Sequence, residues 1–364
     1  MSPRVMRAMA APVLSHLDPD LMAVLDDLRG RLSRVFRAGP DGFTFAVSGT
    51  GTSGMECAVA NLAEGRRALA VVTGYFGDRL AQMLERYGAE VTRLDVEWGR
   101  ACDPAAVRRA LDSSRAELVA VVHAETSTGV LNPLADVARI ARERGALTVA
   151  DAVTSLGAHP LDVAAWDVDA CYSCTQKALG APSGLAPIAF SARALGGRRR
   201  SRSFSFDLAL LEDYWLRRTY HHTISAPLVY ALAEALACVE EEGLEARWAR
   251  HERHHRALAA ALQAMGLELL PPERERLWTL NAVRVPSDVD EAAVRRHLLE
   301  RSGIEIGGGL GPLAGRIWRV GLMGSGSTGA ILLQFLGAFE RALLAAGFRP
   351  DPGAGVEAAV RLLH

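Results

Sequence analysis

The chain has 364 residues, of which 49% are hydrophobic and 23% are charged, the balance of a folded globular protein rather than a disordered one. Its 41 basic and 42 acidic side chains leave a formal net charge of −1, which argues against nucleic acid as the main partner. No apolar run approaches the about 20 residues of a membrane-spanning helix. Five cysteines in a chain of this length do not indicate a disulfide framework, so we expect a cytoplasmic protein with one large and one smaller domain.

The first half of the chain alternates between apolar runs and amphipathic stretches. The apolar runs predict strands at Phe43–Val47, Ala68–Val72, Leu118–His123, Leu147–Ala150, Ala170–Tyr172 and Ala186–Phe190. The amphipathic stretches predict helices at Asp78–Tyr87, Pro104–Leu111 and Ala135–Arg144. Strands and helices that alternate in this way form a largely parallel sheet with helices on both faces. We therefore predict an α/β fold that binds its ligand beyond the carboxyl ends of the strands.

The pattern changes after Pro227, where two long helical stretches follow each other. These are Leu228–Gly243 and a second stretch from about Leu244 to Met265. The remaining predicted elements are a strand at Trp278–Val285, a helix at Val289–Arg301, a strand at Trp318–Gly321 and a final helix near Thr328–Ala345. This order predicts a large domain of residues 1–242 and a smaller α/β domain of residues 243–364.

A glycine-rich loop, Ser48–Gly54, follows the first predicted strand and precedes a helix predicted to begin at Met55. Its three glycines satisfy G-x-G-x-x-G, the pattern of a dinucleotide site. Such a site also needs an acidic residue about 20 positions later, at the end of the next strand, but the next strand is followed by Thr73-Gly74. Threonine hydroxyls and a helix N-terminus instead suit a single phosphate. A plain strand-to-helix turn is the alternative.

Only one of the 41 basic residues is a lysine, Lys177, and the other 40 are arginines. Arginine can replace lysine as a surface charge, but not as an amine that loses its proton and forms a Schiff base. Asp151 ends a predicted strand, and Lys177 follows the next one. Both side chains are therefore expected at the same sheet edge as the glycine loop. A phosphate cradle, an acid and a lysine are the parts that a pyridoxal phosphate site requires.

Three stretches of the sequence resemble class V aminotransferases of fold type I, in the alanine–glyoxylate and serine–pyruvate branch. They are Ser48–Glu56, His123–Gly129 together with Asp151–Ser155, and Tyr172–Leu179. The resemblance continues through Tyr220–Thr223, Glu305–Pro312 and Trp318–Gly324, and it covers nearly the whole chain in order. It implies a large domain with a mostly parallel seven-stranded sheet, a smaller C-terminal α/β domain and a homodimer that shares its active sites across the interface.

The resemblance also implies a role for each matched position around the ring of pyridoxal 5'-phosphate. Lys177 matches the Schiff-base lysine, and Asp151 matches the partner of the pyridine nitrogen. Val153 matches a residue that packs on one face of the ring, and Phe76 matches an aromatic residue that stacks on the cofactor. Thr126 matches a small hydroxyl residue on the ring-oxygen side.

Further matches concern the phosphate and the substrate. The positions that match phosphate contacts within the subunit are Thr50, Gly51, Thr52 and Gln176. Tyr220 and Thr223 match residues that reach the phosphate of the neighbouring subunit. Arg319 matches the arginine that binds the substrate carboxylate, a contact for which a planar guanidinium is well suited.

The activity that the resemblance implies is transamination between a small amino acid, alanine or serine, and a 2-keto acid, glyoxylate or pyruvate. In that reaction the amino acid displaces Lys177 from the cofactor aldehyde. The freed Lys177 amine then removes the α-proton of the amino acid and returns it to the cofactor. One alternative is a related pyridoxal phosphate enzyme, such as a lyase, a decarboxylase or a specialised biosynthetic aminotransferase. A non-enzymatic protein that binds the cofactor is a further alternative.

Two short motifs point to other chemistry but lack the partners it needs. The segment His251–His255 satisfies H-E-x-x-H, a zinc-protease pattern, yet no third ligand follows nearby, so we expect no metal site. Cys171 and Cys174 form a C-x-x-C without a second pair, which favours buried structural cysteines. A desulfurase needs a nucleophilic cysteine in a later loop, whereas Cys238 lies in a helical stretch.

Overall fold

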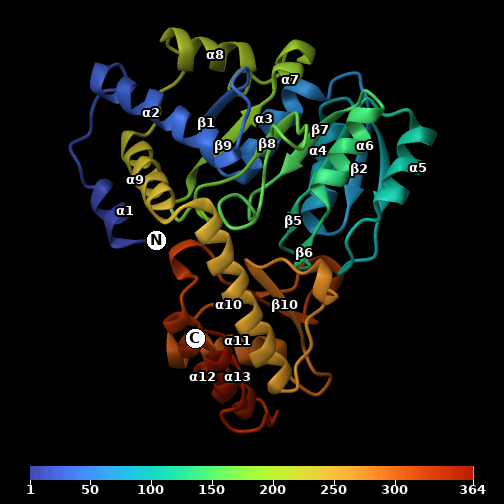
Figure 1. The fold of residues 1–364 in the computed structure, drawn as a ribbon, viewed down its shortest axis with the longest axis vertical. Coiled ribbons are helices and arrows are strands. Elements are labelled where there is room, and N and C mark those ends of the chain that lie inside the picture. Colours follow the sequence, from blue (N-terminus) through green and yellow to red (C-terminus); the bar gives the residue numbers. More distant parts are fainter. Residues whose placement is uncertain (364) are drawn as a thin grey trace.

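The computed structural model describes residues 1–363. Figure 1 shows a larger part built on a wide sheet and a smaller part formed by the C-terminal residues, with the long helix α10 (Leu244–Ala264) running from one into the other. Each part has its own hydrophobic core. The first core extends from Leu21 to Val239, and the second extends from Ala257 to Ala359.

The large sheet has seven strands in the order β1-β9-β8-β7-β4-β2-β3. Their bounds are β1 (Phe43–Gly49), β2 (Arg67–Val72), β3 (Glu90–Asp95), β4 (Leu118–Val122), β7 (Leu147–Asp151), β8 (Ala170–Tyr172) and β9 (Gly184–Phe190). Strand β9 pairs antiparallel with β1 and β8, and every other neighbouring pair is parallel. The prediction of a mostly parallel sheet is therefore confirmed.

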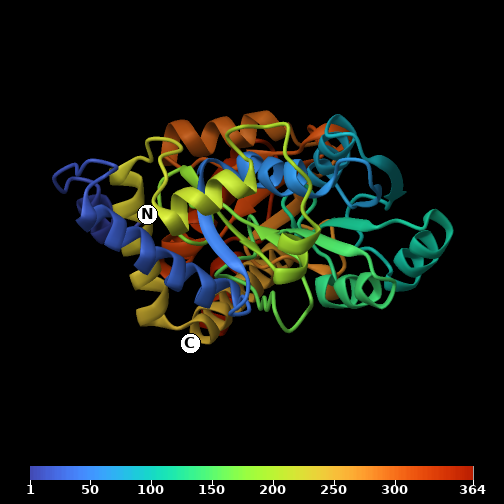
Figure 2. The same cartoon turned by 90° about the horizontal axis from the view of Figure 1, so that it is seen from above.

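Helices cover the sheet and connect its parallel strands. The connecting helices are α3 (Gly51–Leu62), α4 (Tyr75–Arg86), α5 (Pro104–Ser114) and α6 (Leu134–Glu143). Four more helices of this part are α2 (Pro19–Phe36), α7 (Ala192–Gly197), α8 (Leu208–Arg217) and α9 (Ala226–Glu242), and the short α1 (Pro3–Ala8) packs on α9. Figure 2 shows α1 and α2, in dark blue, at the opposite end of the molecule from the teal segment that contains α5.

The smaller part has an antiparallel sheet in the order β10-β12-β11. Its elements are β10 (Leu280–Arg284), α11 (Glu291–Ser302), β11 (Gly307–Gly308), β12 (Ile317–Gly321), α12 (Gly329–Ala345) and α13 (Ala354–Leu363). Short elements complete the chain: the ribbon β5 (Ala124–Glu125) with β6 (Val130–Leu131), and the 3-10 turns η1 (Glu273–Glu275), η2 (Gly311–Leu313) and η3 (Gly324–Gly326). None of the helices within residues 1–363 combines the length and the apolar character needed to cross a bilayer.

Three local expectations were wrong. Strand β3 was not predicted, because it lies at the sheet edge and its residues are charged and largely exposed. Helix α3 begins at Gly51 instead of Met55, since Gly49 makes the turn with a φ of 132° and Thr50 caps the helix. The helix predicted to be the last is followed by α13, which packs on α10.

Candidate active site

A cavity of about 230 Å³ opens at the carboxyl ends of the central strands. Ten of the twelve predicted site residues line it, namely Thr50, Gly51, Thr52, Phe76, Thr126, Asp151, Val153, Gln176, Lys177 and Arg319. Nine lie at the carboxyl ends of strands of the larger part or shortly after them, in the following loop or the first turn of the next helix, whereas Arg319 comes from the smaller part of the chain. The cavity is thus closed by both parts of the molecule.

The first wall of the cavity is the N-terminus of α3. Thr50 precedes the helix, and its amide donates to Ser53 Oγ at 3.3 Å. The next amides, of Gly51 and Thr52, fall in the first helical turn, where no intrahelical acceptor exists. Gly51 packs so closely that a Cβ would lie 2.7 Å from Val153 Cγ2. The backbone donors and the helix dipole make this wall suitable for an anion.

Asp151 provides the buried acid of the cavity. Its side chain ends β7 and is 3% exposed. One carboxylate oxygen accepts from the amide of Val153 at 2.8 Å, and burial raises the pKa of Asp151 to about 7. A cationic partner would offset this burial cost, and a protonated pyridine nitrogen is such a partner.

Lys177 lies in a tight turn that follows β8. The amide of Gly180 donates to Lys177 O, and the amide of Ala181 donates to Thr175 O, each at 3.0 Å. Arg247 of α10 donates to Ala178 O at 2.6 Å. These contacts fix the backbone of the turn, while the Lys177 side chain remains half-buried at the cavity.

The N-terminus of α4 carries Phe76 and is held by a buried carboxylate, Glu125. This carboxylate accepts from the amide of Gly77 at 3.0 Å, from the amide of Phe76 at 3.4 Å and from Ser127 Oγ at 2.6 Å. Gly74 packs so tightly on it that a Cβ would lie 2.6 Å from Glu125 Cγ. Glu125 therefore fixes the backbone of the first turn of α4, which carries Phe76. Glu125 was not predicted, because the α4 amides that it binds lie about fifty residues away in the chain.

Arg319 reaches the cavity from the central strand of the smaller sheet. Its Nε donates to Gly308 O at 2.7 Å, and its Nη1 donates to Thr126 O at 3.4 Å. Burial lowers the pKa of Arg319 from its usual value. A substrate carboxylate would offset this cost, since a guanidinium presents five N–H donors in a planar arrangement.

Tyr220 and Thr223 do not line the cavity of this subunit. Both are exposed, and the Tyr220 side chain is 61% accessible. Several cavity residues were not predicted: Met55, Arg79, Val122, Ala124, Cys174 and Leu280. Arg79 is the only charged residue among these, and it lies one helical turn after Phe76 on α4.

The residues present fit pyridoxal 5'-phosphate. The anion-binding wall of α3 suits the phosphate, the buried Asp151 suits a protonated pyridine nitrogen, and Lys177 supplies the amine that an aldehyde requires. Val153 and Phe76 supply apolar surface for a planar ring. The site therefore defines a pyridoxal phosphate enzyme.

The comparisons with known proteins agree with this site. The chain matches the family described as aminotransferase class-V over residues 5–314. It is 36% identical to the (S)-ureidoglycine–glyoxylate transaminase of Bacillus subtilis over 99% of this chain and 92% of that protein. It is also 36% identical to an alanine–glyoxylate aminotransferase of Drosophila melanogaster over 90% of this chain and 86% of that protein.

Solved structures of aminotransferases are also similar to this chain. The ureidoglycine–glyoxylate aminotransferase of Bacillus subtilis has a TM-score of 0.96 at 37% identity, with 100% of this chain and 95% of that chain covered. An alanine–glyoxylate aminotransferase of Nostoc sp. has a TM-score of 0.91 at 43% identity, with 94% and 92% covered. The protein is thus a fold type I, pyridoxal phosphate-dependent aminotransferase. It belongs to the class V aminotransferase family, as the sequence resemblance predicted.

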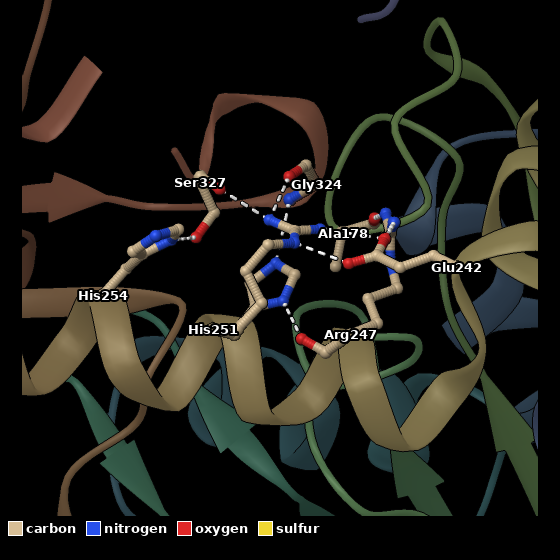
Figure 3. Close-up of polar contacts among 8 residues, drawn as sticks. Ala178, Glu242, Arg247, His251, His254, Gly324 and Ser327 are labelled. Atoms are coloured by element: carbon tan, nitrogen blue, oxygen red, sulfur yellow. Dashed lines mark hydrogen bonds and ion pairs between the residues drawn. The ribbon is translucent and has the colours of Figure 1, made fainter. Parts of the chain in front are cut away.

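His251, the first residue of the H-E-x-x-H segment, joins α10 to the loop after β12, as Figure 3 shows. His251 Nδ1 donates to Arg247 O at 2.7 Å, and His251 Nε2 accepts from the amide of Gly324 at 3.1 Å. Both ring nitrogens are therefore engaged. His255 Nδ1 lies 2.7 Å from Asn281 Oδ1. Within residues 1–363, no group of three or more histidine, cysteine, aspartate or glutamate side chains is arranged to hold a metal ion.

The same view shows how Glu242 joins the two parts of the molecule. Glu242, at the end of α9, pairs with Arg250 at 2.5 Å and with the buried Arg247. Arg247 donates to Ala178 O beside Lys177, and Arg250 donates to Ser327 O at 2.6 Å in the loop after β12. The network therefore connects the backbone next to Lys177 with the loop that follows the strand of Arg319.

Replacing Glu242 with glutamine is expected to lower the free energy of unfolding by about 1–3 kcal/mol, because two partly buried guanidinium groups lose their counter-ion. Urea unfolding of the variant measures this loss. The matched control is Glu241→Gln, which removes an exposed pair with Arg4 and is expected to cost less. Equal losses in both variants would contradict a special role for Glu242.

The raised pKa of Asp151 predicts a pH-dependent stability of the cofactor-free protein. The folded pKa of about 7 lies above the value near 3.9 of an unfolded chain. The protonated Asp151 carboxyl therefore makes its full contribution to the free energy of unfolding below pH 4, and this contribution is lost as the pH rises through 7. Between pH 6 and 8.5 we expect the wild type to lose about 1 kcal/mol relative to Asp151→Asn.

Urea unfolding of both cofactor-free proteins at the two pH values tests this prediction. Asp112→Asn is the control, because Arg144 lowers the pKa of Asp112 and this group does not titrate in the window. Parallel pH profiles of the wild type and Asp151→Asn would show that the burial of Asp151 carries no such cost.

Proposed function

We propose that the protein transfers the amino group of a small amino acid, alanine or serine, to a small 2-keto acid, with glyoxylate preferred over pyruvate. The observation that carries the proposal is the convergence of Lys177, Asp151 and Arg319 on one cavity. Val122, Ala124 and Leu280 add small or apolar side chains to the lining, which suits a short substrate side chain. Relatives named alanine–glyoxylate aminotransferase support alanine and glyoxylate among these substrates.

Each residue has a defined task in the proposed reaction. The bound cofactor supplies an aldehyde that takes the amino group and a ring that accepts the electrons of the broken Cα–H bond. Arg319 binds the substrate carboxylate and thereby fixes the orientation of the α-carbon. The Nζ of Lys177 takes the α-proton and returns it in the following step. The Asp151 carboxylate holds a proton on the pyridine nitrogen.

A half-reaction tests this function. The visible spectrum of the purified protein should change when alanine or serine is added, and it should recover when glyoxylate or pyruvate is added. (S)-Ureidoglycine belongs in the donor panel because a relative of that name covers 99% of this chain. Release of many equivalents of keto acid per active site, or of carbon dioxide, without a 2-keto acid acceptor would instead support a lyase or a decarboxylase, because a transaminase stops after one equivalent. A spectrum that no amino acid alters would contradict transamination.

The proposal includes a homodimer in which Tyr220 and Thr223 reach the phosphate of the neighbouring active site. Its support is that both residues are exposed and lie outside the cavity of their own subunit. Phe204, stacked on His221, is also 70% accessible. We further propose a domain boundary at residues 242 and 243, between the two cores, and a cytoplasmic location.

A further inference from the structure

Two arginines line the cavity, and they contact different sides of it. Arg319 donates to Thr126 O, beside the predicted ring-oxygen side. Arg79 Nη1 instead donates to Thr52 Oγ1 at 3.1 Å, on the anion-binding wall of α3. The family resemblance assigned no role to Arg79. Its guanidinium is nevertheless the cation that contacts the loop expected to hold the phosphate.

The orientation of Arg79 is set by its neighbours on α4. Its guanidinium carbon lies 5.1 Å from the centre of the Phe76 ring and 5.4 Å from the centre of the Tyr75 ring. The adjacent carboxylate, Asp78, pairs with Arg93 at 2.9 Å and not with Arg79. In the described part of the chain Arg79 has no ion pair, and its one hydrogen bond is to a neutral hydroxyl. Most of its five N–H donors are therefore available to an anion.

A cation at this end of the cavity would offset the charge of a bound phosphate. A phosphate monoester carries a charge of about −1.5 to −2 near pH 7. The groups of the α3 wall, which are the amides of Gly51 and Thr52 and the hydroxyls of Thr50 and Thr52, are all neutral. Lys177 is committed to the aldehyde of the cofactor. The only other cation of the cavity, Arg319, contacts Gly308 and Thr126.

We propose that Arg79 binds the phosphate of pyridoxal 5'-phosphate and sets the preference of the protein for the phosphorylated cofactor over pyridoxal. Arg79 rotates from Thr52 Oγ1 onto a phosphate oxygen, while its stacking on Phe76 keeps the guanidinium at the wall. Arg79 thus contacts both the phosphate and Phe76, the residue that packs on the cofactor ring. Glu125 helps to position both Phe76 and Arg79, because it fixes the first turn of α4.

Cofactor titration of the cofactor-free full-length protein tests this proposal. Pyridoxal 5'-phosphate and pyridoxal are each titrated into the wild type and Arg79→Gln, and binding is followed by absorbance and by quenching of intrinsic fluorescence. We expect the Kd of the phosphorylated cofactor to rise about 10- to 100-fold, the value of one hydrogen bond between charged groups. Pyridoxal has no phosphate for Arg79 to bind, so its Kd should change less than about threefold.

Arg86→Gln is the matched control, because Arg86 is an exposed arginine in the last turn of the same helix. It should leave both Kd values unchanged. A loss of affinity for both cofactors in Arg79→Gln would overturn the proposal, since Arg79 would then act through Phe76 and the ring. Unchanged Kd values together with a raised KM for a dicarboxylic amino acid would assign Arg79 to the substrate and would also overturn it. Circular dichroism confirms that each variant is folded.

Discussion

Lys177→Arg is expected to reduce transamination by about 10⁴-fold or more, because it removes both the amine that bonds to the cofactor and the base that moves the α-proton. Arginine keeps the positive charge and most of the length of the side chain. It remains protonated near neutral pH and cannot replace an amine in either task. A loss of this size therefore separates the chemical role of Lys177 from its charge.

The composition of the chain makes this prediction easy to measure. Because Lys177 is the only lysine, borohydride reduction followed by digestion should give a single lysine-linked pyridoxyl peptide in the wild type and none in Lys177→Arg. The control is Arg86→Lys, which adds a lysine on an exposed helix surface. If the added lysine is labelled as strongly as Lys177, then labelling reports the availability of amines and not the active site.

Most residues of the candidate cofactor site could be predicted from the sequence, because they lie where strands end. Asp151 and Lys177 follow buried apolar strands, and the glycine loop precedes a helix. In a parallel sheet these positions meet at one edge whatever the rest of the fold does. The ring-binding residues and Arg319 depended on the family resemblance instead, since no local pattern distinguishes them.

The residues that the sequence did not reveal act through tertiary contacts. Glu125 lies in a short ribbon and binds the first turn of α4. Arg79 resembles any arginine of an amphipathic helix until its contact with Thr52 is known. Strand β3 has no buried apolar run to predict it. In each case the deciding interaction joins segments that are distant in the chain or lies at a surface, where sequence periodicity carries little information.

The contacts of Arg319 also suggest how the two parts of the molecule act together. Arg319 belongs to the smaller sheet but donates to Thr126 of the large part. The loop after its strand is held by Arg250 and His251 of α10, and Arg250 shares Glu242 with Arg247, which holds the backbone beside Lys177. One ion-pair network thus positions the backbone near both Arg319 and Lys177, the residues proposed to bind the substrate carboxylate and to move the α-proton.

Arg319→Gln is expected to lower kcat/KM for alanine or serine by about 10²- to 10³-fold, mainly through KM, because the substrate carboxylate loses a charged two-point contact. An amine of similar size without a carboxylate, such as ethylamine, should lose much less, since it never used this contact. Steady-state kinetics with amino acids and single-turnover spectra with the amine provide the two measurements.

The matched control is Arg284→Gln, an exposed arginine on the neighbouring strand β10, which should leave both reactions unchanged. Arg319 also donates to Gly308 O and Thr126 O, so its loss could act by displacing Thr126. In that case the amino acid and the carboxylate-free amine would lose activity equally, and the affinity for the cofactor would fall as well. A selective loss for the amino acid, with cofactor affinity retained, is the result that identifies Arg319 as the carboxylate-binding residue.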